Sequence, residues 1–233
     1  MLTLLTYPRN GDVFSLSPFC VKAALLLQYS GQTWQREDLN DPRKMPHSKL
    51  PVMRTPAGLV ADSTEIRKYL ETKGTDFDPD LSSRDKAYGH ALTRMAEDVL
   101  YFHVVQDRWG NDAVWPTIRD TYFKDIPGFV RRPITKSIRK SVKSGLSFNG
   151  IGRFNEKDRA DRLDQDLEAV TTLLKDSPFL LGGKITSADF SVASMLQAMQ
   201  TTPVQTNLVR RISDDALLTG YVDHVFQEAV PLP

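Results

Sequence analysis

The stretch Ser17-Pro18-Phe19-Cys20 lies between residues 2–7, which are rich in strand formers, and a segment whose periodicity predicts an amphipathic helix that ends near Gly31. Serine followed by proline is typical of a helix start, because the hydroxyl caps a backbone N–H and proline gives up an N–H that would lack a partner. The sequence therefore predicts a hydroxyl and a thiol in a first helical turn, where the dipole favours negative charge. This placement suits a bound thiolate, and it also suits a simple helix cap.

The following residues predict three more strands and a second helix. A weak strand over residues 33–39 is followed by a polar loop and then by a hairpin whose three-residue turn is Pro56-Ala57-Gly58. Asp62-Ser63 precedes a short amphipathic helix that Gly74 closes. The resulting order, β-α-β-β-β-α, predicts a mixed sheet with at least one crossover connection.

An acidic, proline-bearing linker over residues 75–80 predicts a domain boundary, with domains at 1–75 and 82–233. The second domain is predicted to be entirely helical from its apolar periodicity. Pro116, Pro127 and Pro133 predict short or kinked helices in its middle. Thr186-Ser187-Ala188-Asp189 predicts a capping box at the start of a later helix.

Composition narrows the classes of function. A net charge of +1 argues against duplex nucleic acid as a partner. The sequence has no apolar run of membrane-spanning length and no signal-peptide pattern, so the cytoplasm is the expected location. The single cysteine, Cys20, excludes an internal disulfide and a cysteine-based zinc site, and the four histidines are scattered, so no metal is expected.

Two further motifs in the first part have both a structural and a functional interpretation. Leu50-Pro51 is a simple start of an edge strand, or a cis turn whose Leu50 N–H and C=O pair with an extended, peptide-like ligand. Asp62-Ser63 caps a helix, or it also binds the ammonium and carboxylate of a ligand.

Taken together, these motifs and the order of elements resemble the glutathione transferase superfamily, in which a thioredoxin-like domain precedes an all-helical domain. Ser17-Pro18-Phe19-Cys20 is similar to the Ser-x-x-Cys of serine-type transferases and to the Cys-Pro-x-Cys of glutaredoxins. Leu50-Pro51 is similar to the family's cis-proline, and Asp62-Ser63 to its Glu-Ser pair that holds the γ-glutamyl group. Phe179-Leu180-Leu181-Gly182 and the Thr186 segment match its N-capping box region. The resemblance implies glutathione as co-substrate, and a homodimer.

Within the superfamily, the chain most resembles the metaxin-like, failed-axon-connections branch. That branch is less securely catalytic than the main transferase classes, so a non-catalytic glutathione-binding or adaptor protein is the alternative to an enzyme. The segments that carry this resemblance are Lys49-Leu50-Pro51, Ala61-Asp62-Ser63, Arg108-Trp109, Arg131-Arg132, Gly150-Ile151-Gly152-Arg153, Asp166-Leu167 and the Phe179 segment.

The resemblance implies conjugation of the glutathione thiolate to a small hydrophobic electrophile, with Ser17 as the catalytic hydroxyl. Lowering a thiol pKa of about 8.5 by about 1.5 units requires roughly 2 kcal/mol, and a hydrogen bond to a charged acceptor supplies about 1.5–3 kcal/mol. Tyr7 is a rival hydroxyl, and Cys20 is a rival thiol that would give a glutathione-dependent thioltransferase. The expected glutathione-binding residues are Lys49, Leu50, Pro51, Asp62 and Ser63, with Lys44 and His47 as further cationic candidates.

The stretch from Arg131 to Lys143 carries six cations and no acid. It is interpreted either as a lip for anionic substrates or as a membrane-surface contact, and alternatively as an ordinary solvated helix face.

Overall fold

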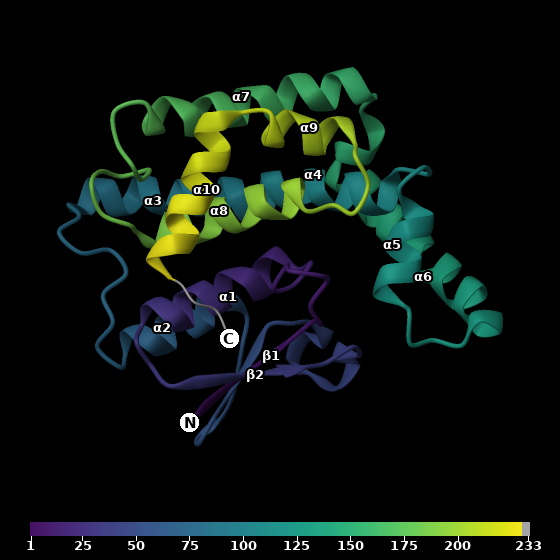
Figure 1. Ribbon diagram of the computed structural model, residues 1–233, viewed down its shortest axis with the longest axis horizontal. Helices are drawn as coiled ribbons and strands as arrows, with labels where there is room; N and C mark the ends of the chain where they lie inside the picture. Colours follow the sequence, from purple (N-terminus) through teal and green to yellow (C-terminus); the bar gives the residue numbers. More distant parts are fainter. Residues whose placement is uncertain (230–233) are drawn as a thin grey trace.

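The computed structural model describes residues 1–229 and contains a small mixed sheet followed by a long series of helices (Figure 1). The thioredoxin-like and all-helical fold that the sequence predicts is confirmed. The first part of the chain contains β1 (Leu2–Thr6), α1 (Pro18–Tyr29), β2 (Trp34–Asp38), short 3₁₀ turns at Pro42–Lys44 and Pro46–Ser48, β3 (Val52–Thr55), β4 (Gly58–Ala61) and α2 (Ser63–Glu71).

The sheet has the strand order β2-β1-β3-β4. β1 and β2 are parallel and are joined through α1, whereas β3 is antiparallel to both β1 and β4. Thr55 pairs with Gly58, so the hairpin turn between β3 and β4 has two residues, and the predicted three-residue turn is wrong by one. The sheet order places the end of β1, and the loop after it, beside the start of β3.

Helix α1 is buried on nearly all sides, which corrects the amphipathic pattern expected for it. Residues 20–27 are all buried, because α1 lies between the sheet and α8 (Figure 1). The burial includes Lys22, whose Nζ lies 2.5 Å from Oε1 of Glu97, which also accepts a hydrogen bond from Ser191. A buried ion pair is costly to break, so this contact ties α1 to the helical part of the chain.

The remainder of residues 1–229 is helical. A continuous rod runs from Ser83 to Gly110 and includes two π-helical segments. α5 is short and has Pro116 in its first turn, as predicted, whereas α6 is 22 residues long although it contains Pro133. A short helix around Pro133 is therefore not found, and the alternative of a kink there stays a prediction. Proline near a helix start removes few backbone bonds. The elements are α3 (Ser83–Met95), η3 (Ala96–Leu100), α4 (Tyr101–Val105), η4 (Gln106–Gly110), α5 (Trp115–Tyr122), α6 (Gly128–Asn149), a 3₁₀ turn (Ile151–Arg153), α7 (Glu156–Leu174), α8 (Ser187–Gln200), α9 (Asn207–Ser213) and α10 (Ala216–Glu228).

The predicted capping box at α8 is present. The Asp189 carboxylate accepts hydrogen bonds from the backbone N–H and the hydroxyl of Thr186, from the N–H of Leu180 and from the hydroxyl of Tyr221. This network fixes the start of the helix that packs against α1.

The segment between α2 and α3 contains neither helix nor strand, and the division that we propose, after residue 75 and before residue 82, falls within it. The carboxylate of Asp78 in this segment accepts hydrogen bonds from the N–H and hydroxyl of Ser187, so the linker is held against α8. The last four residues of the proposed second domain, 230–233, lie outside the described part of the chain. None of the helices within residues 1–229 combines the length and the apolar character that a membrane span requires.

Candidate active site

Ser17 is the N-cap of α1, as its sequence context predicts. Its hydroxyl oxygen accepts a hydrogen bond from the N–H of Cys20 at 3.4 Å, and its own N–H donates to the hydroxyl of Ser15 at 3.3 Å. The cap does not use the proton of the Ser17 hydroxyl, because capping uses only the oxygen as an acceptor. The residue is half-buried and lines a cavity.

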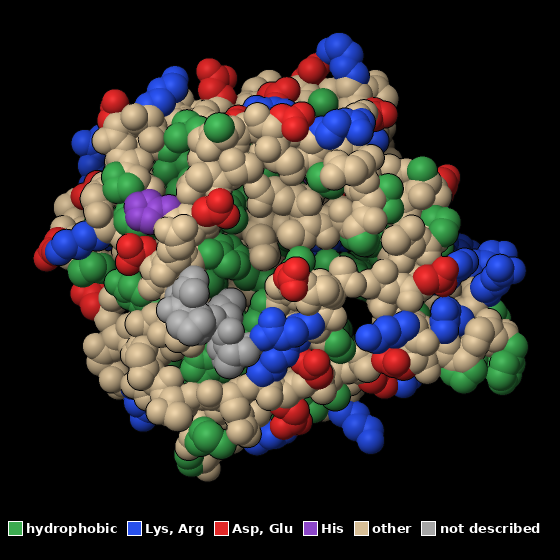
Figure 2. Space-filling view, in the orientation of Figure 1, with side chains coloured by type: hydrophobic (Ala, Val, Ile, Leu, Met, Phe, Trp, Pro, Cys, Tyr) green, Lys and Arg blue, Asp and Glu red, His purple; other side chains and the backbone are tan. Residues whose placement is uncertain are grey.

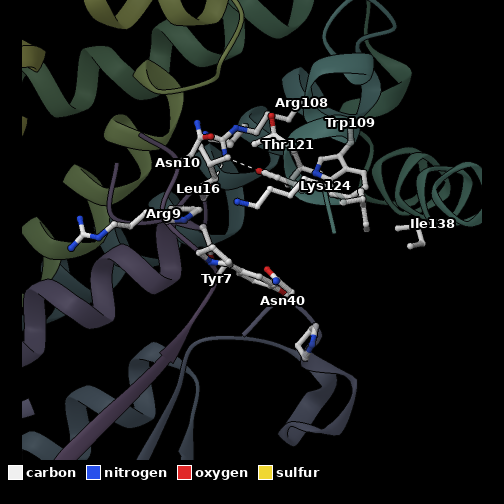
Figure 3. A pocket seen from close by; sticks show the side chains of 18 of the residues that line it. Tyr7, Arg9, Asn10, Leu16, Asn40, Arg108, Trp109, Thr121, Lys124 and Ile138 are labelled. Carbon is white, nitrogen blue, oxygen red and sulfur yellow. Dashed lines mark hydrogen bonds between the residues drawn. The ribbon is translucent and has the colours of Figure 1, made fainter. Parts of the chain in front are cut away.

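This cavity has a volume of about 500 Å³ and lies between the loop after β1 and the helices α4 to α6. Figure 3 shows Tyr7, Leu16 and Asn40 on one side and Arg108, Trp109, Thr121 and Lys124 on the other. The cavity lining contains aromatic and aliphatic side chains and three cations, and it contains no acidic residue. Its lining residues are Tyr7, Pro8, Arg9, Asn10, Leu16, Ser17, Pro18, Asn40, Pro42, Tyr101, Val104, Val105, Arg108, Trp109, Thr121, Tyr122, Phe123, Lys124 and Ile138.

Arg108 bonds directly to the segment that precedes Ser17, and the sequence analysis did not identify it as a site residue. It is 2 % exposed and donates hydrogen bonds to the carbonyl of Leu16 at 2.5 Å and to the hydroxyl of Tyr122 at 3.0 Å. Its other acceptors are the carbonyl of Ala198 and the hydroxyl of Thr202. Within residues 1–229 the guanidinium forms no salt bridge, although its charge also acts on the neighbouring Asp107, where it lowers the carboxyl pKa against the effect of burial. Arg108 therefore brings positive charge to the wall of the cavity.

Cys20 lies beneath Ser17 and does not line the cavity. Its side chain is fully buried and packs with Leu5, Leu50 and Val52. Burial raises the pKa of the Cys20 thiol above its ordinary value, against hydrogen bonds from Thr6 and Ser17 that lower it. A thiol in this state is mostly protonated at neutral pH and is a poor nucleophile.

Tyr7 lines the cavity near the end of β1. Burial raises the pKa of its hydroxyl well above the ordinary value, and the neighbouring Cys20 contributes in the same direction. The Tyr7 hydroxyl is therefore protonated at neutral pH and is able to donate a hydrogen bond.

Leu50-Pro51 and Asp62-Ser63 lie side by side in the structure. The Leu50-Pro51 peptide bond is cis, and the carbonyl of Pro51 accepts a hydrogen bond from the N–H of Asp62 at 3.2 Å. Leu50 also packs in the same apolar cluster as Cys20, so the three sequence motifs meet at one end of the sheet. None of these four residues is part of the cavity lining.

Ser63 differs from an ordinary helix-start serine. The α2 cap is Asp62, whose exposed carboxylate accepts from the N–H of Thr64 at 2.7 Å. The hydroxyl of Ser63 is buried and has no hydrogen-bond partner within residues 1–229. A buried hydroxyl without a partner is costly, and a ligand that bonds to it would remove this cost.

The remaining sequence candidates are cations on the loop before β3. Lys44, His47 and Lys49 are all exposed, and none of them lines the cavity. Within the described residues, no group of three or more His, Cys, Asp and Glu side chains is arranged to hold a metal ion.

Two family models and a known relative match this chain, and all of them are glutathione S-transferases. Residues 18–115 match the glutathione S-transferase N-terminal domain family, and residues 155–224 match the glutathione S-transferase C-terminal domain family. The isoprene-epoxide–glutathione S-transferase of Rhodococcus sp. (strain AD45) is 32% identical over 219 residues, covering 88% of this chain and 89% of the relative.

Solved structures share the fold at low identity. Glutathione transferase GSTFuA3 from Phanerochaete chrysosporium has a TM-score of 0.61 at 18% identity, covering 98% of this chain and 96% of that one. CsGST63524 of Ceriporiopsis subvermispora, solved in complex with glutathione, has a TM-score of 0.57 at 15% identity, covering 99% of this chain and 98% of that one. With the confirmed fold and the relative that spans most of its length, the chain belongs to the glutathione S-transferase family.

Proposed function

We propose that this protein conjugates the thiolate of glutathione to a small hydrophobic electrophile, with an epoxide as the favoured class. The observation that carries the proposal is the Ser17 hydroxyl, which stands at the start of α1 on the wall of a largely apolar cavity. The relative that is 32% identical acts on isoprene epoxide by its name, which supports the choice of electrophile.

In this mechanism Ser17 donates its hydroxyl proton in a hydrogen bond to the glutathione sulfur. The helix dipole of α1 and the positive charge of Arg108 favour the same negative charge. The glutathione thiol releases its proton to water, and the thiolate attacks an epoxide carbon. A C–S bond forms as a C–O bond breaks, and the resulting alkoxide takes up a proton from water. No residue of the cavity lining is acidic, so no carboxylate opposes the thiolate there.

The rest of glutathione is proposed to extend along the start of β3 and α2. The backbone of Leu50 pairs with the peptide, the buried Ser63 hydroxyl bonds to the γ-glutamyl carboxylate, and Asp62 faces the ammonium group. Lys49 is the proposed partner of the glycyl carboxylate. The Ser63 hydroxyl supports this binding position for glutathione. It has no hydrogen-bond partner within residues 1–229, so a bound γ-glutamyl carboxylate would supply one.

Two alternatives predict different outcomes. A thioltransferase would use Cys20, whose thiol is fully buried and has a raised pKa. A non-catalytic glutathione-binding or adaptor protein would bind glutathione without turnover. The resemblance to the metaxin-like branch remains a prediction, and it favours the adaptor.

The test measures glutathione binding and turnover separately. Glutathione should raise the melting temperature of the protein, and a small alkyl epoxide should be consumed with saturation in both substrates. Binding without turnover across epoxides and aromatic halides would favour the adaptor, and no melting shift would remove glutathione as the ligand. Reduction of a mixed disulfide that is lost in Cys20→Ser would favour the thioltransferase.

A further inference from the structure

Helix α6 has a cationic face. Residues 126–155 contain no acid, and α6 alone carries six cations. Phe129, Arg132, Lys136, Lys140 and Lys143 are spaced at i, i+3, i+7, i+11 and i+14, which places them on one side of the helix. We call these five residues the α6 face.

Several cations of this face line an open groove of about 500 Å³ between α5 and α6, with Trp115 as its aromatic residue. Arg139 pairs with Asp112 at 2.6 Å, and Lys143 lies 3.8 Å from the same carboxylate. The groove is lined by Trp115, Arg119, Arg132, Thr135, Lys136, Arg139, Lys140 and Lys143.

Arg132, Lys136 and Lys140 have no acidic partner within residues 1–229, and all three are exposed. Like charges one helical turn apart destabilise a helix by a few tenths of a kcal/mol for each pair. These three residues therefore form a row of positive charges without counter-charges, which an extended anionic surface would complement.

The same helix also exposes large apolar side chains. Phe129 is 85% exposed at its start and Phe148 is 89% exposed at its end. Figure 2 shows Lys and Arg side chains gathered with hydrophobic ones at the end of the molecule where Figure 1 places α6. Basic residues combined with exposed phenylalanines are typical of helices that lie in a bilayer interface.

We propose that the α6 face docks this protein on an anionic phospholipid bilayer. The cations approach the lipid phosphates, and the ring of Phe129 enters the boundary between headgroups and acyl chains. Phe148 joins it from the end of α6, about 100° around the helix from Phe129. A soluble polyanion would complement the row of cations but would leave Phe129 and Phe148 in water, so the bilayer accounts for more of the surface. The proposal does not depend on the proposed function.

The experiment is co-sedimentation of the full chain with vesicles of phosphatidylcholine alone and with increasing fractions of phosphatidylglycerol. Binding should rise with the anionic fraction and fall at high salt. The triple variant Arg132→Gln, Lys136→Gln, Lys140→Gln should lower the partition coefficient about a hundredfold, since each cation near an anionic surface contributes about a factor of five.

A matched control removes the same number of charges elsewhere. The control lysines lie outside α6 and are exposed: Lys73 follows α2, Lys86 is in α3 and Lys175 follows α7. The triple Lys→Gln variant at these positions should bind like the unaltered protein. The double variant Phe129→Ser, Phe148→Ser leaves the charge unchanged and should lower partitioning about tenfold or more. All altered side chains are exposed, so circular dichroism and melting temperature should remain close to those of the unaltered protein.

Three outcomes would overturn the proposal. The first is no binding at any anionic fraction, and the second is equal loss in the control triple variant. The third is unchanged binding in the phenylalanine variant, which would indicate association through charge alone. Sedimentation velocity tests whether the α6 face instead binds a second copy of the chain. If the unaltered protein is a dimer and the phenylalanine variant is a monomer, the bilayer proposal is wrong.

Discussion

The guanidinium of Arg108 donates to the carbonyl oxygen of Leu16, 2.5 Å away, and Leu16 directly precedes Ser17. This bond connects η4 of the helical rod to the loop that carries Ser17, the residue whose hydroxyl we propose to be catalytic. The other acceptors of Arg108 lie on α5 and at the end of α8, so the position of Ser17 depends on three helical segments.

Arg108→Gln should change both stability and the pH dependence of catalysis. The variant leaves buried carbonyls without donors, which costs about 1–3 kcal/mol for each unsatisfied group. Loss of the charge should also raise the pKa of the bound glutathione thiol, so the rise of kcat/KM with pH should move to higher pH. The measurements are urea unfolding and a pH–rate profile.

Arg108→Lys provides the control for charge. It keeps the positive charge but loses the forked geometry, so it should restore the pH profile while stability stays low. A profile for Arg108→Gln that matches the unaltered enzyme would limit Arg108 to a structural role.

Ser17→Ala should lower kcat/KM for conjugation about 10- to 100-fold, which corresponds to a charge-assisted hydrogen bond of about 1.5–3 kcal/mol. It should also lower the free energy of unfolding by about 1 kcal/mol, because Ser17 caps α1. Conjugation rates and urea unfolding measure the two effects separately.

Ser82 offers a matched control for the loss of the cap. It is the N-cap of α3, where its hydroxyl accepts from the N–H of Asp85, and it does not line the cavity. Ser82→Ala should lose similar stability and keep its activity. Equal activity loss in both variants would contradict the catalytic role of Ser17.

The fold was predictable because its signals are local. Ser17-Pro18 marks a helix start whatever its surroundings, and Asp62-Ser63 and Thr186–Asp189 do the same. The sequence pattern did not reveal that Lys22 is buried, because its partner Glu97 is 75 residues away in the chain. A lysine in an apolar helix looks like a solvent-facing residue until a second layer covers it.

The site was predictable only in part for the same reason. The Ser17 motif and the two motifs around β3 each carry a local pattern. Arg108-Trp109 contributes to the family resemblance, but no local pattern indicates what Arg108 binds, since its partners Leu16, Ala198 and Thr202 are 90 or more residues away. Its proposed role follows from packing between distant segments, because its hydrogen bonds join η4 to the loop before Ser17 and to the end of α8.

Ser63→Ala should have opposite effects on binding and stability. The Ser63 hydroxyl is buried and has no partner among the described residues, so its removal should leave the unfolding free energy unchanged or slightly higher. The glutathione KM should rise about tenfold or more if the hydroxyl bonds to the γ-glutamyl carboxylate. Glutathione-induced melting shifts and KM values measure both effects.

Ser194 in α8 provides the comparison, because its buried hydroxyl also lacks a partner in the part of the chain that the structure describes, and it does not line the cavity. Ser194→Ala should match Ser63→Ala in stability and leave the glutathione KM unchanged. An unchanged KM in both variants would remove Ser63 from the proposed binding position for glutathione.

His103 should make the protein less stable as the pH falls below neutrality. Its side chain is buried, and burial, together with the charge of Arg159, lowers its pKa to about 4. The pKa of an unfolded-state histidine is about 6.5, so between these values the unfolded chain binds a proton that the folded chain does not. Stability present above pH 6.5 is therefore lost as the pH falls toward 4, by about 2 kcal/mol between pH 7 and pH 5.

Urea unfolding at both pH values should show a smaller loss in His103→Gln than in the unaltered protein. His90 is exposed on α3, and His90→Gln should retain the full pH dependence, whereas an equal loss in all three proteins would assign the acid sensitivity to other groups.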